Sequence, residues 1–287
     1  MKQLLRPIRR IVYAAVAAAV GFSVRLLPTR VKLVLKENSE IIRKMDYARH
    51  DIYLNIESRV ENDVRLLSCA KEPETVDWIE AFFQEGDVFY DVGANVGAYS
   101  LVASSFCQRN IQVYAFEPGF LNFPQLCKNV FTNSMQQSIT PMQVALSNTT
   151  GMEVFNYENL IPGGAIHTLG EPVDYKGESF KPLATQQVFS YRVDDLISQF
   201  KIPAPNHIKI DVDGIELDVL KGADQAMGSP TLKTVLLELD DGDDEAVRIT
   251  EYLEAHGLVF HSKHKFVYGG ESGPLSGIYN YIFQRQD

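Results

Sequence analysis

The spacing of apolar residues predicts strands and helices in alternation from residue 87 onward. The run over 87–92 (DVFYDV) has strand length, the turn GANVG follows it, and residues 98–107 are apolar enough for a helix. A strand over 111–116 and a helix over 121–131 repeat the succession. Further strands are predicted over 139–146, 207–212, 232–239 and 278–283, and further helices over 215–223 and 243–256. This alternation predicts an α/β fold, with a mainly parallel sheet and helices on both faces.

Two stretches depart from that rhythm. Residues 37–86 are mixed, with a short strand predicted over 51–57 and a helix over 74–84, and we expect them to form a lead-in subdomain before a main domain over 87–287. Residues 156–185 are rich in Gly and Pro and have little periodicity. Long segments of this kind in compact domains are often lids or binding loops, so we expect a lid-like insertion there.

The first 36 residues form a basic and apolar segment. Residues 11–24 carry no charge, but as a helix they reach only about 21 Å, which is short of the roughly 30 Å hydrocarbon core of a bilayer. This run should therefore not span a membrane alone. Three alternatives stay open: peripheral membrane contact through residues 1–30, a cleaved signal or transit segment, or a helix docked on its own domain.

Charge and cysteine content narrow the functional class. The net charge of −10 combines +8 in residues 1–50 with −18 in the remaining 237 residues. Such an acidic body should repel nucleic acid, so no nucleic-acid partner is expected. The three cysteines lie far apart without a CxxC pair, which predicts neither a disulfide framework nor a zinc site and favours a reducing, cytoplasmic location.

The turn after the first strand has features of a nucleoside site. Asp91 ends the strand, and Gly93 and Gly97 lie in the loop that leads into the helix. A dinucleotide fingerprint needs two further glycines, where this loop has Asn95 and Ala98, so binding of NAD or FAD loses its main support. A cofactor with a nucleoside and an amino-acid tail fits better. Asp91 can accept from an ammonium directly or through water, and Asn95 can donate to a carboxylate.

Glu117 supports the same interpretation from the next strand. It ends IQVYAFE, 26 residues after Asp91. A carboxylate there can accept hydrogen bonds from both hydroxyls of a ribose, and it would repel a 2′-phosphate.

Four motifs together resemble the FkbM family of S-adenosylmethionine-dependent methyltransferases: DVGANVGAYSLVAS, YAFEPGFLNFPQLCKN, VALSNTTG and IKIDVDGIELDVLKGA. The resemblance implies a Rossmann-like class I fold with a seven-stranded sheet whose last strand is antiparallel. It also implies methyl transfer to a small-molecule, sugar or lipid-linked acceptor, usually at a hydroxyl oxygen. It adds Pro118, Ala145 and Leu146 to the cofactor site. Asp213 stands where the family usually has Glu, which shortens the reach of that carboxylate.

The stretch HIKIDVDGIE places charged side chains on one side of a strand. Asp211 lies at the carboxyl end, on the same rim as Asp91 and Glu117, and is the first catalytic candidate. Lys209 is the second, although a structural ion pair with an acid explains it equally well. His207 lies about 13 Å away at the wrong end of the strand and should belong to the core.

Glu238 and His167 complete the catalytic candidates. Glu238 ends the strand after Asp211, and the two acids could hold magnesium, be solvated, or pair with Lys209, so no metal site is assigned. His167 lies between loop glycines and suits proton transfer near neutral pH, although a loop histidine can also be merely solvated. We expect Asp211 to orient the acceptor hydroxyl, and either Asp211 or His167 to take its proton.

Two other functions compete with a methyltransferase. An NAD-dependent oxidoreductase would use the same sheet but lacks the loop glycines it needs. A catalytically silent nucleoside-binding scaffold would keep the fold without turnover.

Overall fold

The computed structural model describes residues 5–173, 178–242, 244–265 and 277–286, in two units, Met1–Ile41 and Ile42–Asp287. The first unit contains α1 (Leu5–Leu26) and α2 (Thr29–Glu37). Among the described residues, no helix combines the length and apolarity that crossing a bilayer requires. This agrees with the prediction for residues 11–24.

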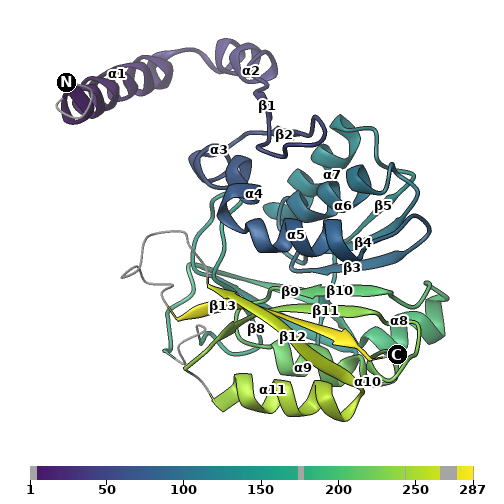
Figure 1. The fold of residues 1–287 in the computed structure, drawn as a ribbon. Coiled ribbons are helices and arrows are strands. Elements are labelled where there is room, and N and C mark those ends of the chain that lie inside the picture. Colours follow the sequence, from purple (N-terminus) through teal and green to yellow (C-terminus); the bar gives the residue numbers. More distant parts are fainter. Residues whose placement is uncertain (1–4, 174–177, 243, 266–276, 287) are drawn as a thin grey trace. The chain divides into compact units, whose positions relative to one another are not determined.

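The second unit is built on a seven-stranded sheet (Figure 1). Its strands are β3 (Val88–Val92), β4 (Gln112–Phe116), β5 (Ile139–Met142), β10 (His207–Ile210), β11 (Thr234–Asp240), β12 (Leu258–Lys265) and β13 (Ile278–Arg285). They lie in the order β12-β13-β11-β10-β3-β4-β5. The pairs from β11 through β5 are parallel, and β13 is antiparallel to both its neighbours. The predicted Rossmann-like class I sheet, with its last strand antiparallel, is confirmed.

Helices cover both faces of this sheet, as the alternating pattern predicts (Figure 1). One face carries α5 (Pro73–Phe82), α6 (Ala98–Phe106) and α7 (Asn122–Thr132), and the other carries α8 (Val193–Phe200), α9 (Glu216–Gly222), α10 (Asp224–Met227) and α11 (Asp244–Ala255). Consecutive strand residues serve opposite cores because side chains alternate along a strand. Phe89 packs with Trp78 and Leu101 in one core, whereas Tyr90 packs with Val219 in the other.

Residues 42–71, part of the predicted lead-in subdomain, belong to the second unit and form a segment that is hydrogen-bonded to α7. Its elements are β1 (Ile42–Lys44), β2 (Tyr53–Asn55), α3 (Arg59–Asp63), a 3₁₀ turn η1 (Arg65–Leu67) and α4 (Ser68–Lys71). The backbone N–H of Asn55 donates to Oδ1 of Asn129 at 2.7 Å, and the Asn55 side chain donates to Thr132 at 2.8 Å. Ser58 and Glu61 cap α3 reciprocally, so the backbone groups that begin this helix are satisfied.

A second, four-stranded sheet differs from the sequence-based expectation. It contains β6 (Ala145–Leu146), β7 (Gly151–Tyr157), β8 (His167–Leu169) and β9 (Ala184–Tyr191), in the order β6-β9-β7-β8. The strand expected over 139–146 is therefore two strands in different sheets, and the segment 156–185 contains β8 and the ends of β7 and β9; its residues 174–177 lie outside the described structure. Seven antiparallel residue pairs between β7 and β9 organise this sheet, and such long-range pairing leaves little trace in local periodicity.

Candidate active site

A cavity of about 330 Å³ opens at the carboxyl ends of β3, β4, β10 and β11, which is where open α/β sheets bind ligands. Nine sequence-predicted residues line it: Gly93, Asn95, Glu117, Pro118, Ala145, Leu146, His167, Asp211 and Glu238. Three predicted residues are not among its lining residues: Asp91, Gly97 and Lys209. The structure thus brings most of the predicted residues together around one cavity. The three exceptions do not line it.

Gly93 and Gly97 are required by the backbone and its neighbours. Both have positive φ, +79° and +83°, which side chains disfavour. A Cβ atom on Gly93 would lie 1.9 Å from the carbonyl oxygen of Asp211, and one on Gly97 would lie 2.4 Å from Cδ1 of Leu126. The glycines therefore allow β10 and α7 to approach the loop closely.

Asp91 lies beneath that loop rather than in the cavity. Its side chain is 1% exposed and accepts a hydrogen bond from Oγ of Ser100 at 2.5 Å. Burial raises its pKa, against the opposing effect of Lys209. The direct ammonium contact expected from the sequence is not supported by this geometry, because the carboxylate is covered and already partnered.

Glu117 is held by two backbone donors. The N–H of Asn95 donates to Oε2 at 2.9 Å and the N–H of Gly119 donates to Oε1 at 2.8 Å. Burial raises the Glu117 pKa to about 7, although these two hydrogen bonds lower it. Each carboxylate oxygen keeps a further acceptor site, so the group can receive two hydroxyl donors.

The side chain of Asn95 has a different partner from the expected one. Its Nδ2 donates to the carbonyl oxygen of Gly164 at 2.7 Å, and its buried Oδ1 is without a hydrogen-bond partner among the described residues. One of the two Nδ2 hydrogens is therefore used by the 156–185 segment, donation to a ligand carboxylate by the other stays a prediction, and Oδ1 is an unpaired acceptor.

Lys209 serves Asp211 and does not reach the cavity. The lysine is 1% exposed, and its Nζ donates to Oδ2 of Asp211 at 2.5 Å and lies 5.2 Å from the ring centroid of Tyr99. Burial lowers the Lys209 pKa, but Asp211 and Glu72 outweigh that effect and raise it. The ammonium lowers the pKa of Asp211 in turn, against burial, so Asp211 is ionised. The geometry supports the ion-pair alternative for Lys209.

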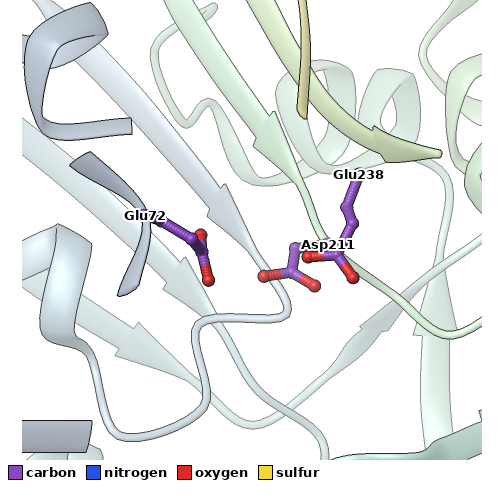
Figure 2. A group of neighbouring side chains, drawn as sticks. All are labelled: Glu72, Asp211 and Glu238. Atoms are coloured by element: carbon purple, nitrogen blue, oxygen red, sulfur yellow. The ribbon is translucent and has the colours of Figure 1, made fainter. Parts of the chain in front are cut away.

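Three carboxylates converge at this point, as Figure 2 shows. Glu72, Asp211 and Glu238 each offer an oxygen atom, and these atoms lie within 4.8 Å of one another. Burial and the neighbouring Asp211 raise the Glu238 pKa well above its usual range, which favours the protonated form of this carboxyl group. Lys71 and Lys209 already pair with Glu72 and Asp211, so these carboxylates do not require a metal ion for charge balance.

His167 contributes an unpaired imidazole. It is 8% exposed and packs against the rings of Phe155 and Tyr157, with centroid distances of 6.0 and 5.1 Å. Neither ring nitrogen has a hydrogen-bond partner among the described residues, while the backbone N–H donates to Oδ2 of Asp213 at 3.0 Å. Burial lowers its pKa, so the ring is neutral near pH 7. The alternative of a solvated loop histidine is wrong.

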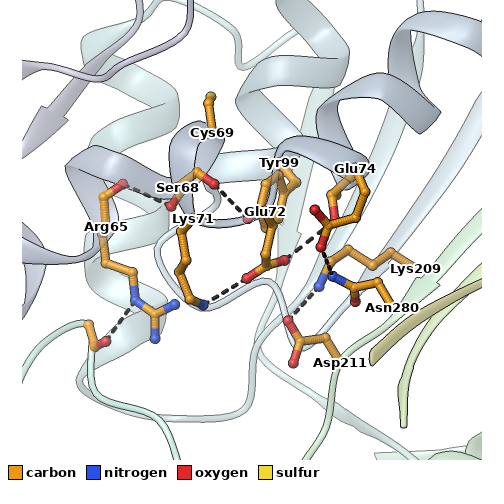
Figure 3. Close-up of polar contacts among 12 residues, drawn as sticks. Arg65, Ser68, Cys69, Lys71, Glu72, Glu74, Tyr99, Lys209, Asp211 and Asn280 are labelled. Atoms are coloured by element: carbon orange, nitrogen blue, oxygen red, sulfur yellow. Dashed lines mark hydrogen bonds and ion pairs between the residues drawn. The ribbon is translucent and has the colours of Figure 1, made fainter. Parts of the chain in front are cut away.

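Sequence reasoning missed the contribution of the lead-in subdomain. Arg65 and Lys71 line the cavity, and the buried Glu72 lies beside Lys71 (Figure 3). These residues lie upstream of all four motifs, and their only local signal is charge next to a predicted helix. Their place in the site depends on contacts with distant elements, such as the hydrogen bond from Tyr99 Oη to the carbonyl oxygen of Ser68 at 3.0 Å.

Comparisons with known proteins show which sequences this chain is similar to. A family model described as the methyltransferase FkbM domain matches residues 91–260. The hexuronic acid methyltransferase AglP of Haloferax volcanii is 27% identical over 185 residues, covering 64% of this chain and 69% of that protein. The 31-O-demethyl-FK506 methyltransferase FkbM of Streptomyces tacrolimicus is 28% identical over 193 residues, covering 60% of this chain and 73% of that protein.

Among solved structures, the methyltransferase FkbM from Methylobacillus flagellatus KT aligns with 70% of this chain and 44% of its own, at 17% identity and a TM-score of 0.49.

Proposed function

This chain belongs to the FkbM family of methyltransferases, and we propose that it transfers a methyl group to a hydroxyl oxygen of a sugar, glycolipid or natural-product acceptor. The family model covers more than half of the chain. The names of the two relatives specify a hexuronic acid and the 31-O-demethyl form of FK506 as their acceptors. The observation that supports hydroxyl methylation best is the ionised Asp211, which lies in the cavity and is held in place by Lys209.

S-adenosylmethionine is the cofactor, and the cavity fits it. Glu117 holds two acceptor sites for ribose hydroxyls, and Asn95 presents an unpaired, buried acceptor oxygen that suits an ammonium. Pro118, Ala145 and Leu146 supply apolar wall beside Glu117. Unpaired buried polar atoms are costly, so their presence in a cavity indicates that a ligand satisfies them. An NAD-dependent oxidoreductase no longer competes as an interpretation, because the family assignment excludes it.

The residues of the chain position the acceptor and move one proton. When bound, S-adenosylmethionine supplies a methyl group already activated by the positive sulfur. Asp211 accepts a hydrogen bond from the acceptor hydroxyl and fixes its direction, and most of the acceleration should come from this positioning. Lys209 keeps the carboxylate ionised and stationary. Burial and the neighbouring Asp211 raise the pKa of Glu238, which favours its protonated form, and a protonated Glu238 could donate a hydrogen bond in the cavity.

Two groups remain as the general base. Asp211 has the better position, but the pKa lowered by Lys209 makes it a weak base. His167 is neutral, its ring nitrogens are unpaired, and it lies in the 163–169 stretch that borders the cavity. A positioned base typically contributes about a hundredfold to ten-thousandfold in rate.

Single-turnover methyl transfer in Asp211→Asn and His167→Ala tests this mechanism. The base variant should lose about a hundredfold or more in rate while its affinity for S-adenosylhomocysteine, measured by calorimetry, stays unchanged. If both variants keep nearly full rates on the true acceptor, the base lies elsewhere, and Glu238 and Glu216 are the next residues to test. Release of S-adenosylhomocysteine across a panel of sugars, glycolipids and polyketide alcohols identifies the acceptor. Cofactor binding without turnover on any of them would favour the silent scaffold.

We further propose that residues 1–30 bring the enzyme to the cytosolic face of a membrane, which would suit a lipid-linked acceptor. The segment is strongly basic, and α1 within it has exposed apolar side chains at Val16, Val20 and Phe22. Basic, apolar helices bind anionic lipid surfaces. Flotation with anionic liposomes should carry the full-length protein and leave a variant without residues 1–30 behind. Equal flotation of the two proteins would contradict this role.

A further inference from the structure

Two cationic side chains line the cavity in the described part of the chain, Arg65 and Lys71, and they differ in their partners. Lys71 Nζ lies 2.7 Å from Oε1 of Glu72, so its charge is balanced. No carboxylate oxygen of the described residues lies within 4.0 Å of an Arg65 side-chain nitrogen, so Arg65 forms no ion pair among them. A partly buried guanidinium without an anion is an unfavourable arrangement unless a ligand supplies the negative charge.

The position of Arg65 is fixed by the 156–185 segment. Its Nε donates to the carbonyl oxygen of Gly163 at 2.8 Å, which is the contact drawn from Arg65 in Figure 3. The next carbonyl, that of Gly164, accepts from Asn95 Nδ2. Arg65 and Asn95 therefore bind the carbonyl oxygens of two consecutive residues, Gly163 and Gly164. One Arg65 nitrogen is committed to the protein, and both terminal nitrogens remain available.

Apart from Lys71, the other charged groups that line the cavity are carboxyl groups, and none of those described lies within ion-pair distance of Arg65. Asp211 is matched by Lys209, and Glu72 is matched by Lys71. Burial raises the pKa of Glu117 to about 7 and that of Asp213 to about 6. The cavity thus combines a guanidinium that no described carboxylate contacts directly with several acceptor oxygens, which is complementary to a zwitterion.

We propose that Arg65 binds a carboxylate inside the cavity, and that this carboxylate is the amino-acid tail of the cofactor. The inference rests on the proposed function, because it assumes the same cofactor. Asn95 was the sequence-based candidate for this task, but its Nδ2 already donates one of its two hydrogens to the carbonyl oxygen of Gly164. The tail carries an ammonium beside its carboxylate, so it matches both Arg65 and the acceptor oxygens nearby. An acidic acceptor would offer the same carboxylate chemistry without the ammonium, and it is the second possible source.

Calorimetry with two nucleosides separates these sources. S-adenosylhomocysteine has the amino-acid tail, and 5′-methylthioadenosine lacks it. Arg65→Gln should weaken S-adenosylhomocysteine binding about tenfold to a hundredfold, as expected for a charge-assisted hydrogen bond, and leave 5′-methylthioadenosine binding within twofold of wild type. Arg65→Lys should give an intermediate loss, because it keeps the charge but not the planar fork.

Arg59→Gln is the matched control, because it removes the same charge from the neighbouring α3 at an exposed position outside the cavity lining. It should change neither affinity. Thermal unfolding of the ligand-free variants checks that each is folded.

The acceptor source is tested with D-glucuronate added to the S-adenosylhomocysteine complex. Weaker glucuronate binding in Arg65→Gln, with S-adenosylhomocysteine affinity unchanged, would assign the carboxylate to the acceptor. Equal losses for both nucleosides, or no loss for any of the three probes, would overturn the role of Arg65 while leaving the methyltransferase intact. Wild-type protein that binds neither nucleoside would overturn the proposed function as well.

Discussion

Lys209 Nζ lies 2.5 Å from Oδ2 of Asp211, yet only the aspartate lines the cavity. Lys209 lies in β10 and Asp211 directly follows this strand; the lysine is 1% exposed whereas the Asp211 side chain is 34% exposed. The buried Lys209 therefore keeps the Asp211 carboxylate ionised and holds its orientation toward the cavity.

Replacing Lys209 with Met should destabilise the protein, and it should raise the pH below which the methyl-transfer rate falls. Removing one partner of a buried ion pair costs about 3–5 kcal/mol in the free energy of unfolding, which urea titration measures. Asp211 now has a lowered pKa, so its stabilising contribution is present above the ordinary value near 4 and is lost as pH falls through its folded pKa. In Lys209→Met burial raises that pKa, so single-turnover rates should begin to fall at higher pH.

Lys233→Met is the matched control for that variant. Lys233 also pairs with a buried aspartate, Asp87, at 2.6 Å, but it is 41% exposed and lies outside the cavity lining. It should lose about 1 kcal/mol or less and keep the wild-type pH profile. A Lys209→Met profile identical to wild type would show that Asp211 does not depend on this ammonium.

Glu117 should make cofactor affinity depend on pH. Its folded pKa of about 7 is above the ordinary value near 4.3, so the acid stabilises the free protein below pH 4 and this contribution, about 3 kcal/mol, is lost as pH rises through 7. Ribose hydroxyls prefer the ionised carboxylate. S-adenosylhomocysteine binding should therefore release a proton near pH 6 and tighten toward pH 7.

Two variants check this prediction by calorimetry in buffers of different ionisation enthalpy. Glu117→Ala should weaken S-adenosylhomocysteine about tenfold to a hundredfold. Glu117→Gln should remove the proton release and the pH dependence between pH 6 and 7. Unchanged affinity in Glu117→Ala would place the ribose contact on another residue.

Local patterns predicted the main sheet and most of the cavity, because each strand and its terminal acid lie within a few residues of one another. Gly93 and Glu117 are examples, since a turn and a strand end are readable in a short window. The place of Arg65 in the cavity and the hydrogen-bond partner of Asn95 could not be predicted in this way. Their contacts are with Gly163 and Gly164, some 70 to 100 residues away, and no periodicity records which loop packs against which helix.

Gly93→Ala should abolish cofactor binding and lower stability. The added Cβ would lie 1.9 Å from the backbone oxygen of Asp211, and a backbone atom cannot move aside as a flexible side chain can. The positive φ of +79° adds strain of about 1 kcal/mol. Gly86→Ala is a suitable control, since its φ is +90° but nothing lies within 4 Å of a Cβ there. Gly86→Ala should lose only the stability that the backbone strain costs. If the two variants bind S-adenosylhomocysteine with equal affinity, the close contact between Gly93 and the Asp211 carbonyl oxygen does not matter for binding.

His207 belongs to a buried relay at the opposite ends of the strands. Trp78 Nε1 donates to Oγ1 of Thr234 at 2.9 Å, and that hydroxyl lies 2.7 Å from Nδ1 of His207. Trp offers only a donor, so the threonine hydroxyl hydrogen points to Nδ1, and Nε2 carries the ring hydrogen that faces Asp87 at 3.0 Å. The imidazole is therefore a neutral structural connector, as its position on the strand predicts.

His207→Ala should cost about 3 kcal/mol in unfolding free energy, because it leaves a cavity and removes hydrogen-bond partners from Thr234 and Asp87 at a site that is 0% exposed. Affinity for S-adenosylhomocysteine should stay within twofold of wild type, since His207 does not line the cavity. His256→Ala is the matched control: it removes a histidine that pairs with an aspartate at the surface, Asp224, at 3.1 Å, and should cost less than about 1 kcal/mol. Urea unfolding and calorimetry measure both quantities. A large loss of nucleoside affinity in a folded His207→Ala protein would mean that this end of the sheet is coupled to the active site.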